Sequence, residues 1–141
     1  MVNLVQTPAG DLELEGSARG VGFLPQTLSY NPSSNATNVL LVADRAYRVK
    51  AILGRVQAAG TDGSAVTATV YKAPSGTAIA SGTPLHSGTF NLKGTASTNQ
   101  TLTLSATAGV LDIAAGDTIG VILTGTLTTA TGGITVALTP R

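Results

Sequence analysis

Residues capable of acid–base or nucleophilic chemistry are few in this sequence. It contains one histidine, His86, and no cysteine. A serine nucleophile needs a base that a third group orients, and no acidic residue lies within a dozen positions of His86. The absence of cysteine excludes disulfides and thiolate metal sites. We therefore predict that the chain is not an enzyme and that it needs no cofactor.

The largest group of acidic residues lies near the start of the chain. Asp11, Glu13 and Glu15 alternate with Leu12 and Leu14, so a strand would place the three carboxylates on one face and the two leucines on the other. Such a carboxylate face is able to collect a hard cation. Because no further Asp or Asn loop with ligand spacing accompanies it, we predict a solvated or neighbour-facing strand and no metal site.

Two kinds of small-molecule site are also disfavoured. The glycine-rich segment 16–22 has no helix-forming segment after it to aim backbone amides at a phosphate, so nucleotide binding is excluded. Tyr30, Tyr47 and Tyr71 lie on separate segments, and tryptophan is absent. Sugar binding usually uses clustered exposed aromatic rings, so it is a secondary hypothesis.

Half of the eight basic residues lie on or beside one expected strand: Arg45, Arg48, Lys50 and Arg55. The formal net charge is only +1 and the basic residues form no run, so the sequence lacks the charge pattern that nucleic acid binding needs. Arg48 and Lys50 share a strand face, which is either a solvated sheet face or a docking patch for an acidic protein surface.

The elements that position these residues are predicted to be strands of one domain. At 141 residues the chain has the size of a single domain, and we divide it into an extended N-terminal arm, 1–22, and a β-sandwich domain, 23–141. The start of the chain has no basic segment followed by an apolar run, and no stretch of about 18 apolar residues occurs. We expect neither a signal peptide nor a membrane segment.

Two neighbouring segments carry the clearest strand patterns. The continuous apolar run 39–42 lies between an Asn-rich stretch and Asp44, which predicts a buried strand. The segment 47–53 alternates and predicts a half-buried strand. Its expected inward-facing side chains are Tyr47, Val49, Ala51 and Leu53.

The remaining segments repeat strand and turn signals. Asp62 and Gly63 predict a hairpin turn between two antiparallel strands, and the alternating segment 66–70 predicts the second of them. The irregular segment 77–94 is expected to hold one or two short strands, anchored by Ile79, Leu85, Phe90 and Leu92. The total is about eight strands without a convincing helix, which favours an all-β, antiparallel two-sheet β-sandwich, most simply a jelly roll.

Several of these strand and turn phrases resemble structural proteins of tailed bacteriophages, of the capsid (head) decoration or cement type. The resemblance covers roughly residues 38–140. The phrases that carry it are VADRAY (42–47), AGTDGSAVT (59–67), VYKAPSGT (70–77), FNLKGT (90–95) and AGDTIG (115–120).

The resemblance implies a homotrimer that binds the major capsid protein on the outer head surface and stabilises the shell by bridging capsomers. It also implies assembly in the host cytoplasm, with neither nucleic acid nor membrane as a partner. We predict contacts to the capsid or to a sister subunit by arm, arm-adjacent and basic residues. These are Leu4, Val5, Leu12, Leu14, Phe23, Leu24, Arg48 and Lys50. The alternative is a host-surface or glycan-binding module of a phage fibre or tail.

Overall fold

The computed structural model describes residues 3–6, 12–15 and 24–141, and its regular structure is almost entirely strand. A single turn of 3-10 helix, η1 (Ile79–Ser81), is the exception among these residues. No helix in the described part of the chain is long and apolar enough to cross a membrane. The all-β prediction is confirmed.

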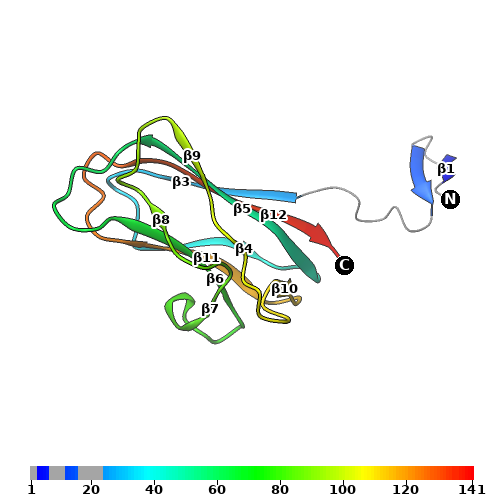
Figure 1. Ribbon diagram of the computed structural model, residues 1–141. Helices are drawn as coiled ribbons and strands as arrows, with labels where there is room; N and C mark the ends of the chain where they lie inside the picture. The colour runs from blue at the N-terminus through cyan, green and yellow to red at the C-terminus, as the bar shows by residue number, and fades with distance from the viewer. Residues whose placement is uncertain (1–2, 7–11, 16–23) are drawn as a thin grey trace.

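Residues 24–141 form two antiparallel sheets (Figure 1). The first, which we call the β5 sheet, has β3 (Leu24–Tyr30) at one edge, followed by β12 (Thr131–Pro140) and β5 (Tyr47–Ala58). Two short strands, β9 (Thr98–Thr101) and β10 (Asp112–Ile113), pair with different parts of the far side of β5.

The second sheet, the β6 sheet, has the same plan. Its edge strand β4 (Thr37–Val42) is followed by β11 (Thr118–Thr124) and β6 (Thr67–Ala73). The far side of β6 pairs with β7 (Thr83–Pro84) and β8 (Phe90–Asn91).

The strand pairing is nested, which identifies the jelly roll. The first strand of the sandwich pairs with the last (β3 with β12), and the second pairs with the next to last (β4 with β11). The pairing continues inward through β5 with β9 and β10, and β6 with β7 and β8. Because each pair of short strands shares one position, the sandwich has eight strand positions, as a jelly roll requires. The predicted architecture is confirmed.

The core between the sheets consists mainly of Val, Ile, Leu and Ala, with Phe90 as its largest fully buried side chain. The Phe90 ring occupies the space that a side chain at position 54 would take. A Cβ atom built on Gly54 would lie 2.7 Å and 2.8 Å from two carbons of the Phe90 ring. Leu85 and Leu92 are buried with Phe90, so three of the four anchors predicted in the segment 77–94 are in the core, while Ile79 is only half-buried.

The turn at Asp62 and Gly63 is not a hairpin turn, contrary to prediction. The strands before and after it, β5 and β6, belong to different sheets and do not pair. The positive backbone φ that makes Asp-Gly a hairpin signal is also not found at Gly63. The loop 59–66 therefore carries the chain from one sheet to the other.

The alternation predicted for the segment 47–53 is interrupted. Tyr47 and Val49 are buried as expected, but beyond them Ile52 is buried and Leu53 is 44% exposed. Leu138 pairs with Val49 and Ala137 pairs with Ala51, so the register shifts by one residue at this point. Such a β-bulge moves the following side chains to the opposite face, and the inward-facing prediction for Leu53 is wrong.

The predicted strand around residues 11–15 is found as β2 (Leu12–Glu15), paired with β1 (Asn3–Gln6). Leu4 pairs with Leu14 and Val5 pairs with Glu13. The pair forms an antiparallel two-stranded sheet within the chain. The division of the chain into an arm and a domain stays a prediction, as most residues between β1 and the sandwich lie outside the described residues.

Candidate functional site

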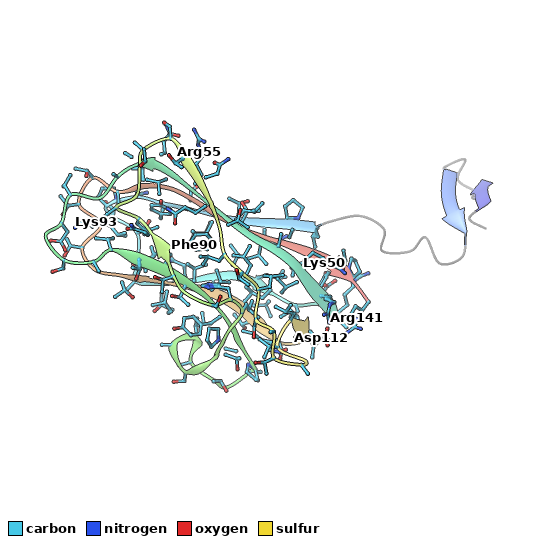
Figure 2. The ribbon with its side chains drawn as sticks, in the orientation of Figure 1. Lys50, Arg55, Phe90, Lys93, Asp112 and Arg141 are labelled. Carbon is cyan, nitrogen blue, oxygen red and sulfur yellow. The ribbon has the colours of Figure 1, made fainter. Side chains whose placement is uncertain are left out.

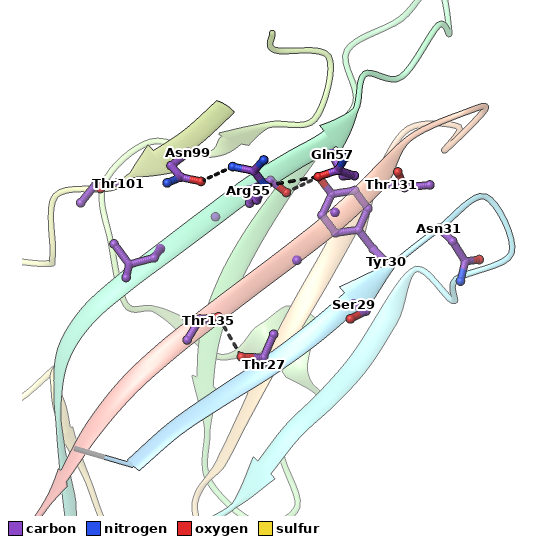
Figure 3. Close-up of a pocket in the computed structure, with 14 residues that line it drawn as sticks. Thr27, Ser29, Tyr30, Asn31, Arg55, Gln57, Asn99, Thr101, Thr131 and Thr135 are labelled. Carbon is purple, nitrogen blue, oxygen red and sulfur yellow. Dashed lines mark hydrogen bonds between the residues drawn. The ribbon is translucent and has the colours of Figure 1, made fainter. Parts of the chain in front are cut away.

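The outer face of the β5 sheet is hollowed into a groove of about 680 Å³ (Figure 3). Strand register places its side chains in two rows, because paired residues in adjacent strands share a face. One row contains Ser29, Gly133, Arg55 and Asn99. The next row contains Thr27, Thr135, Leu53 and Thr101. We call this surface the hydroxyl groove.

Arg55 is the basic residue of the hydroxyl groove, and neutral amides hold its side chain. Its Nε donates to Gln57 Oε1 at 3.3 Å, and a terminal nitrogen donates to Asn99 Oδ1 at 3.1 Å. None of the three ion pairs found in the described residues includes Arg55. Among the described residues, the guanidinium therefore lies between Asn99 and Gln57 (Figure 3) and has no carboxylate partner.

The depth of the groove comes from glycine. A Cβ on Gly133 would meet only ordinary contacts, Leu28 O at 3.5 Å and Thr27 Cγ2 at 3.7 Å, so packing of the sheet does not require glycine there. Without a side chain at Gly133, the space between Ser29 and Arg55 stays open. Thr27 and Thr135 close one side through a hydrogen bond between their hydroxyls, 2.8 Å long.

The outer face of the β6 sheet is apolar at its β4 edge. Val39 and Val42 are each 61% exposed, the highest exposure among the large apolar side chains of residues 24–141. Val39 pairs with Gly120, over which the half-buried side chain of Ile79 packs. The prediction that residues 39–42 form a buried strand is wrong, because β4 is an edge strand with its outer face uncovered. We call Val39 and Val42 the valine edge.

The opposite edge of the same sheet is closed by His86. The backbone N–H of Val70, on β6 between the positions where β7 and β8 pair, donates to His86 Nε2 at 2.9 Å. The N–H of Leu85, the residue before His86, donates to the carbonyl oxygen of Val70. The His86 ring is 5% exposed and stands edge-on to Phe90, with centroids 5.7 Å apart.

Because Nε2 accepts a hydrogen bond from a backbone N–H, His86 is neutral with its proton on Nδ1. Burial lowers the pKa of His86, and backbone hydrogen bonds around Ser87 and Gly88 oppose that shift. The ring therefore serves as an acceptor for β6 in the gap between β7 and β8. No group of three or more His, Asp or Glu residues in the described ranges is placed to hold a metal.

The predicted basic patch is divided between the two ends of β5 (Figure 2). At one end, Arg48 and Arg141 both donate to Asp112 Oδ1, at 2.7 Å and 2.6 Å. The hydrogen bond from Arg48 lowers the pKa of Asp112. Lys50 is exposed on the same strand, whereas Arg55 lies at the other end in the hydroxyl groove. We call Arg48, Lys50 and Arg141 the basic end.

The other predicted contact residues are only partly described. Leu4, Val5, Leu12 and Leu14 occupy register positions in the β1–β2 pair, and Phe23 lies outside the described residues. Leu24 begins β3 and is 39% exposed. Their contacts stay predictions.

Sequence reasoning missed the hydroxyl groove and the valine edge. Each depends on which strands are neighbours, and β5, β9 and β12 are far apart in the sequence. The cluster of threonines in the segments 98–103 and 124–139 was a compositional signal for the groove.

Comparisons with known proteins find little similarity. No family model and no curated protein matches the chain. A chain in the structure of the infectious bursal disease virus Gx strain is a structural neighbour, with 14% sequence identity and a TM-score of 0.35. The match covers 96% of this chain and 36% of that chain. A likeness at this TM-score carries no argument about fold or function.

Proposed function

We propose that the chain is a structural protein of a bacteriophage virion, which decorates the outer head surface and cements neighbouring capsomers of the major capsid protein. The valine edge is the observation that carries this proposal. An exposed apolar edge strand is a ready site for pairing with another chain. In the β6 sheet the far edge is closed by β7, β8 and His86, while β4 has no strand partner on its outer side among the described residues.

The first partner of the valine edge is another copy of the chain, in a homotrimer. The core contains one phenylalanine and no tryptophan among its buried residues, so a single subunit buries few large side chains. Association through Val39 and Val42 would add apolar burial, and each buried valine contributes roughly 1.5 kcal/mol or more.

The capsid contact is assigned to the arm and to the basic end. Strand residues in the arm are able to extend a capsid sheet by backbone hydrogen bonds. Arg48 and Lys50 would then meet acidic groups of the capsid surface, with each exposed ion pair adding at most about 1 kcal/mol. On the basis of these proposed contacts, we assign the chain to the head surface of the virion.

The test mixes purified protein with capsids of the phage that encodes it, prepared without the chain. We expect saturable binding at the stoichiometry of the capsid lattice and a higher melting temperature of the shell. Deletion of residues 1–22 should weaken binding while the sandwich stays folded by circular dichroism. Absence of binding by the full chain would contradict the proposal.

Copy number distinguishes the alternative, a fibre or tail module. Quantitative mass spectrometry of purified virions should find the chain at hundreds of copies if it decorates the head. A few dozen copies or fewer would assign it to a fibre or tail, where the exposed loops and faces of the jelly roll would contact the host surface.

A further inference from the structure

We propose that the hydroxyl groove is a binding site for an acidic oligosaccharide, with Arg55 binding a sugar carboxylate. The groove lies on the outer face of the β5 sheet, away from the valine edge of the β6 sheet. Its volume of about 680 Å³ is within the usual range for small-molecule sites. The proposal does not depend on where the chain sits in a virion.

Arg55 supplies the charge recognition. A guanidinium has five N–H donors, and the two hydrogen bonds described for Arg55 side-chain nitrogens go to the uncharged acceptors Gln57 and Asn99. These amides fix the plane of the guanidinium without neutralising it. The remaining N–H groups are able to bind both oxygens of a carboxylate, which is the geometry that arginine favours.

The other lining groups match a ligand rich in hydroxyls. Ser29, Thr101 and Thr131 line the groove with hydroxyl groups, which both donate and accept hydrogen bonds, as sugar hydroxyls do. Leu53 is 44% exposed at the groove and offers an apolar contact for the C–H face of a sugar ring. Gly133 lies between Ser29 and Arg55 in the strand register and has no side chain, so it leaves room between them.

The same features disfavour a peptide and a nucleic acid. A peptide strand satisfies its backbone by adding to a sheet edge, but the groove lies on a sheet face, where the backbone groups already bond to neighbouring strands. Single-stranded nucleic acid needs exposed aromatic platforms and several cations. The groove has one arginine, and its one aromatic residue, Tyr30, is 2% exposed.

The test is binding of the full chain to trigalacturonic acid, 3′-sialyllactose and a glucuronic acid disaccharide, each compared with neutral maltotriose. Isothermal titration measures affinity, and NMR of labelled protein locates the site. We expect at least one acidic sugar to bind, to shift the resonances of Leu53, Gly133 and Thr135, and to exceed maltotriose in affinity by about tenfold or more.

Two variants test the site, each with a matched control. Arg55→Gln should weaken binding about tenfold to a hundredfold, whereas Arg45→Gln removes the same charge at an exposed position beside Asp44 and should change affinity less than twofold. Gly133→Val should fill the groove and abolish binding. Gly63→Val, in a loop with no atom within 4 Å of an added Cβ, should not.

Three results would overturn the proposal: no binding by any of the three acidic sugars at millimolar concentration, equal affinity for maltotriose, or unchanged affinity in Arg55→Gln. Tighter binding of the acidic peptide DLELE, which is residues 11–15, at the groove would assign the groove to the arm of another copy instead. Capsid binding is measured separately, so failure here would leave the decoration proposal standing.

Discussion

The two outer faces of this jelly roll have opposite chemistry. The β5 sheet presents hydroxyls, amides and a single guanidinium around the open position of Gly133. The β6 sheet presents Val39 and Val42 at an edge where β4 pairs with no further described strand, and Ile79 covers part of its face. A polar, hollowed face stays hydrated until a complementary ligand arrives, whereas an apolar edge gains free energy from any protein surface that covers it.

A two-sheet sandwich is therefore able to separate assembly from recognition. Its two outer faces point in opposite directions, so a contact on one leaves the other accessible. If the valine edge is buried between subunits, that contact leaves the hydroxyl groove uncovered.

The largest expected effect is on self-association. The double substitution Val39→Lys and Val42→Lys replaces the valine edge with two charges, and we expect the dissociation constant of the oligomer to rise by about a hundredfold or more. Sedimentation velocity at micromolar concentration measures the change.

The matched control is Leu53→Lys, which places the same charge on the other outer face. It should leave the oligomer intact, because Leu53 belongs to the hydroxyl groove. Loss of the oligomer in Leu53→Lys would place the self-association surface on the β5 sheet. Survival of the oligomer in the double variant would show that the valine edge is not that surface. A wild-type monomer would contradict the trimer itself.

The next largest effect separates two glycines that line the same groove. Gly54→Ala would place a methyl group 2.7 Å from the Phe90 ring, and such overpacking of a core costs roughly 1–3 kcal/mol in the free energy of unfolding. Gly133→Ala points outward and should change that free energy by less than about 0.5 kcal/mol. Urea denaturation of both variants measures the difference, and equal values would refute the inward and outward assignment.

The sequence was sufficient to predict the fold class, but it did not predict which side chains lie on the outer faces of the two sheets. Period-two alternation and turn residues predicted an all-β sandwich, and Leu85, Phe90 and Leu92 were correctly expected to be anchors. Alternation failed at Leu53, because the bulge depends on how β5 pairs with β12.

Apolar content alone was a poor guide to burial in β4. An apolar run is typical of a strand covered on both faces, but coverage depends on neighbours that are distant in the chain. Val39 and Val42 lie at an edge because β11 is the strand that pairs with β4 and no described strand follows on the other side. The hydroxyl groove escaped prediction for the same reason, since four strands contribute to it.

The smallest expected effect is a pH dependence at the closed edge of the β6 sheet. His86 accepts the Val70 N–H as a neutral ring, and burial lowers its pKa. In the unfolded chain the ordinary pKa is about 6.5, so below that pH the unfolded state binds more protons than the folded state. Stability should therefore be fully present above pH 6.5 and should fall as the pH decreases toward the lowered pKa.

Thermal unfolding between pH 7.5 and pH 5 measures this dependence, with His86→Gln as the reference. Its side-chain oxygen is able to accept the Val70 N–H but does not titrate, so the variant should lose less stability over this range than the wild type. If both proteins lose the same amount, protonation of His86 does not open this edge. Neither edge of the β6 sheet would then respond to pH through His86, and pairing of β6 with β7 and β8 alone would keep the far edge closed.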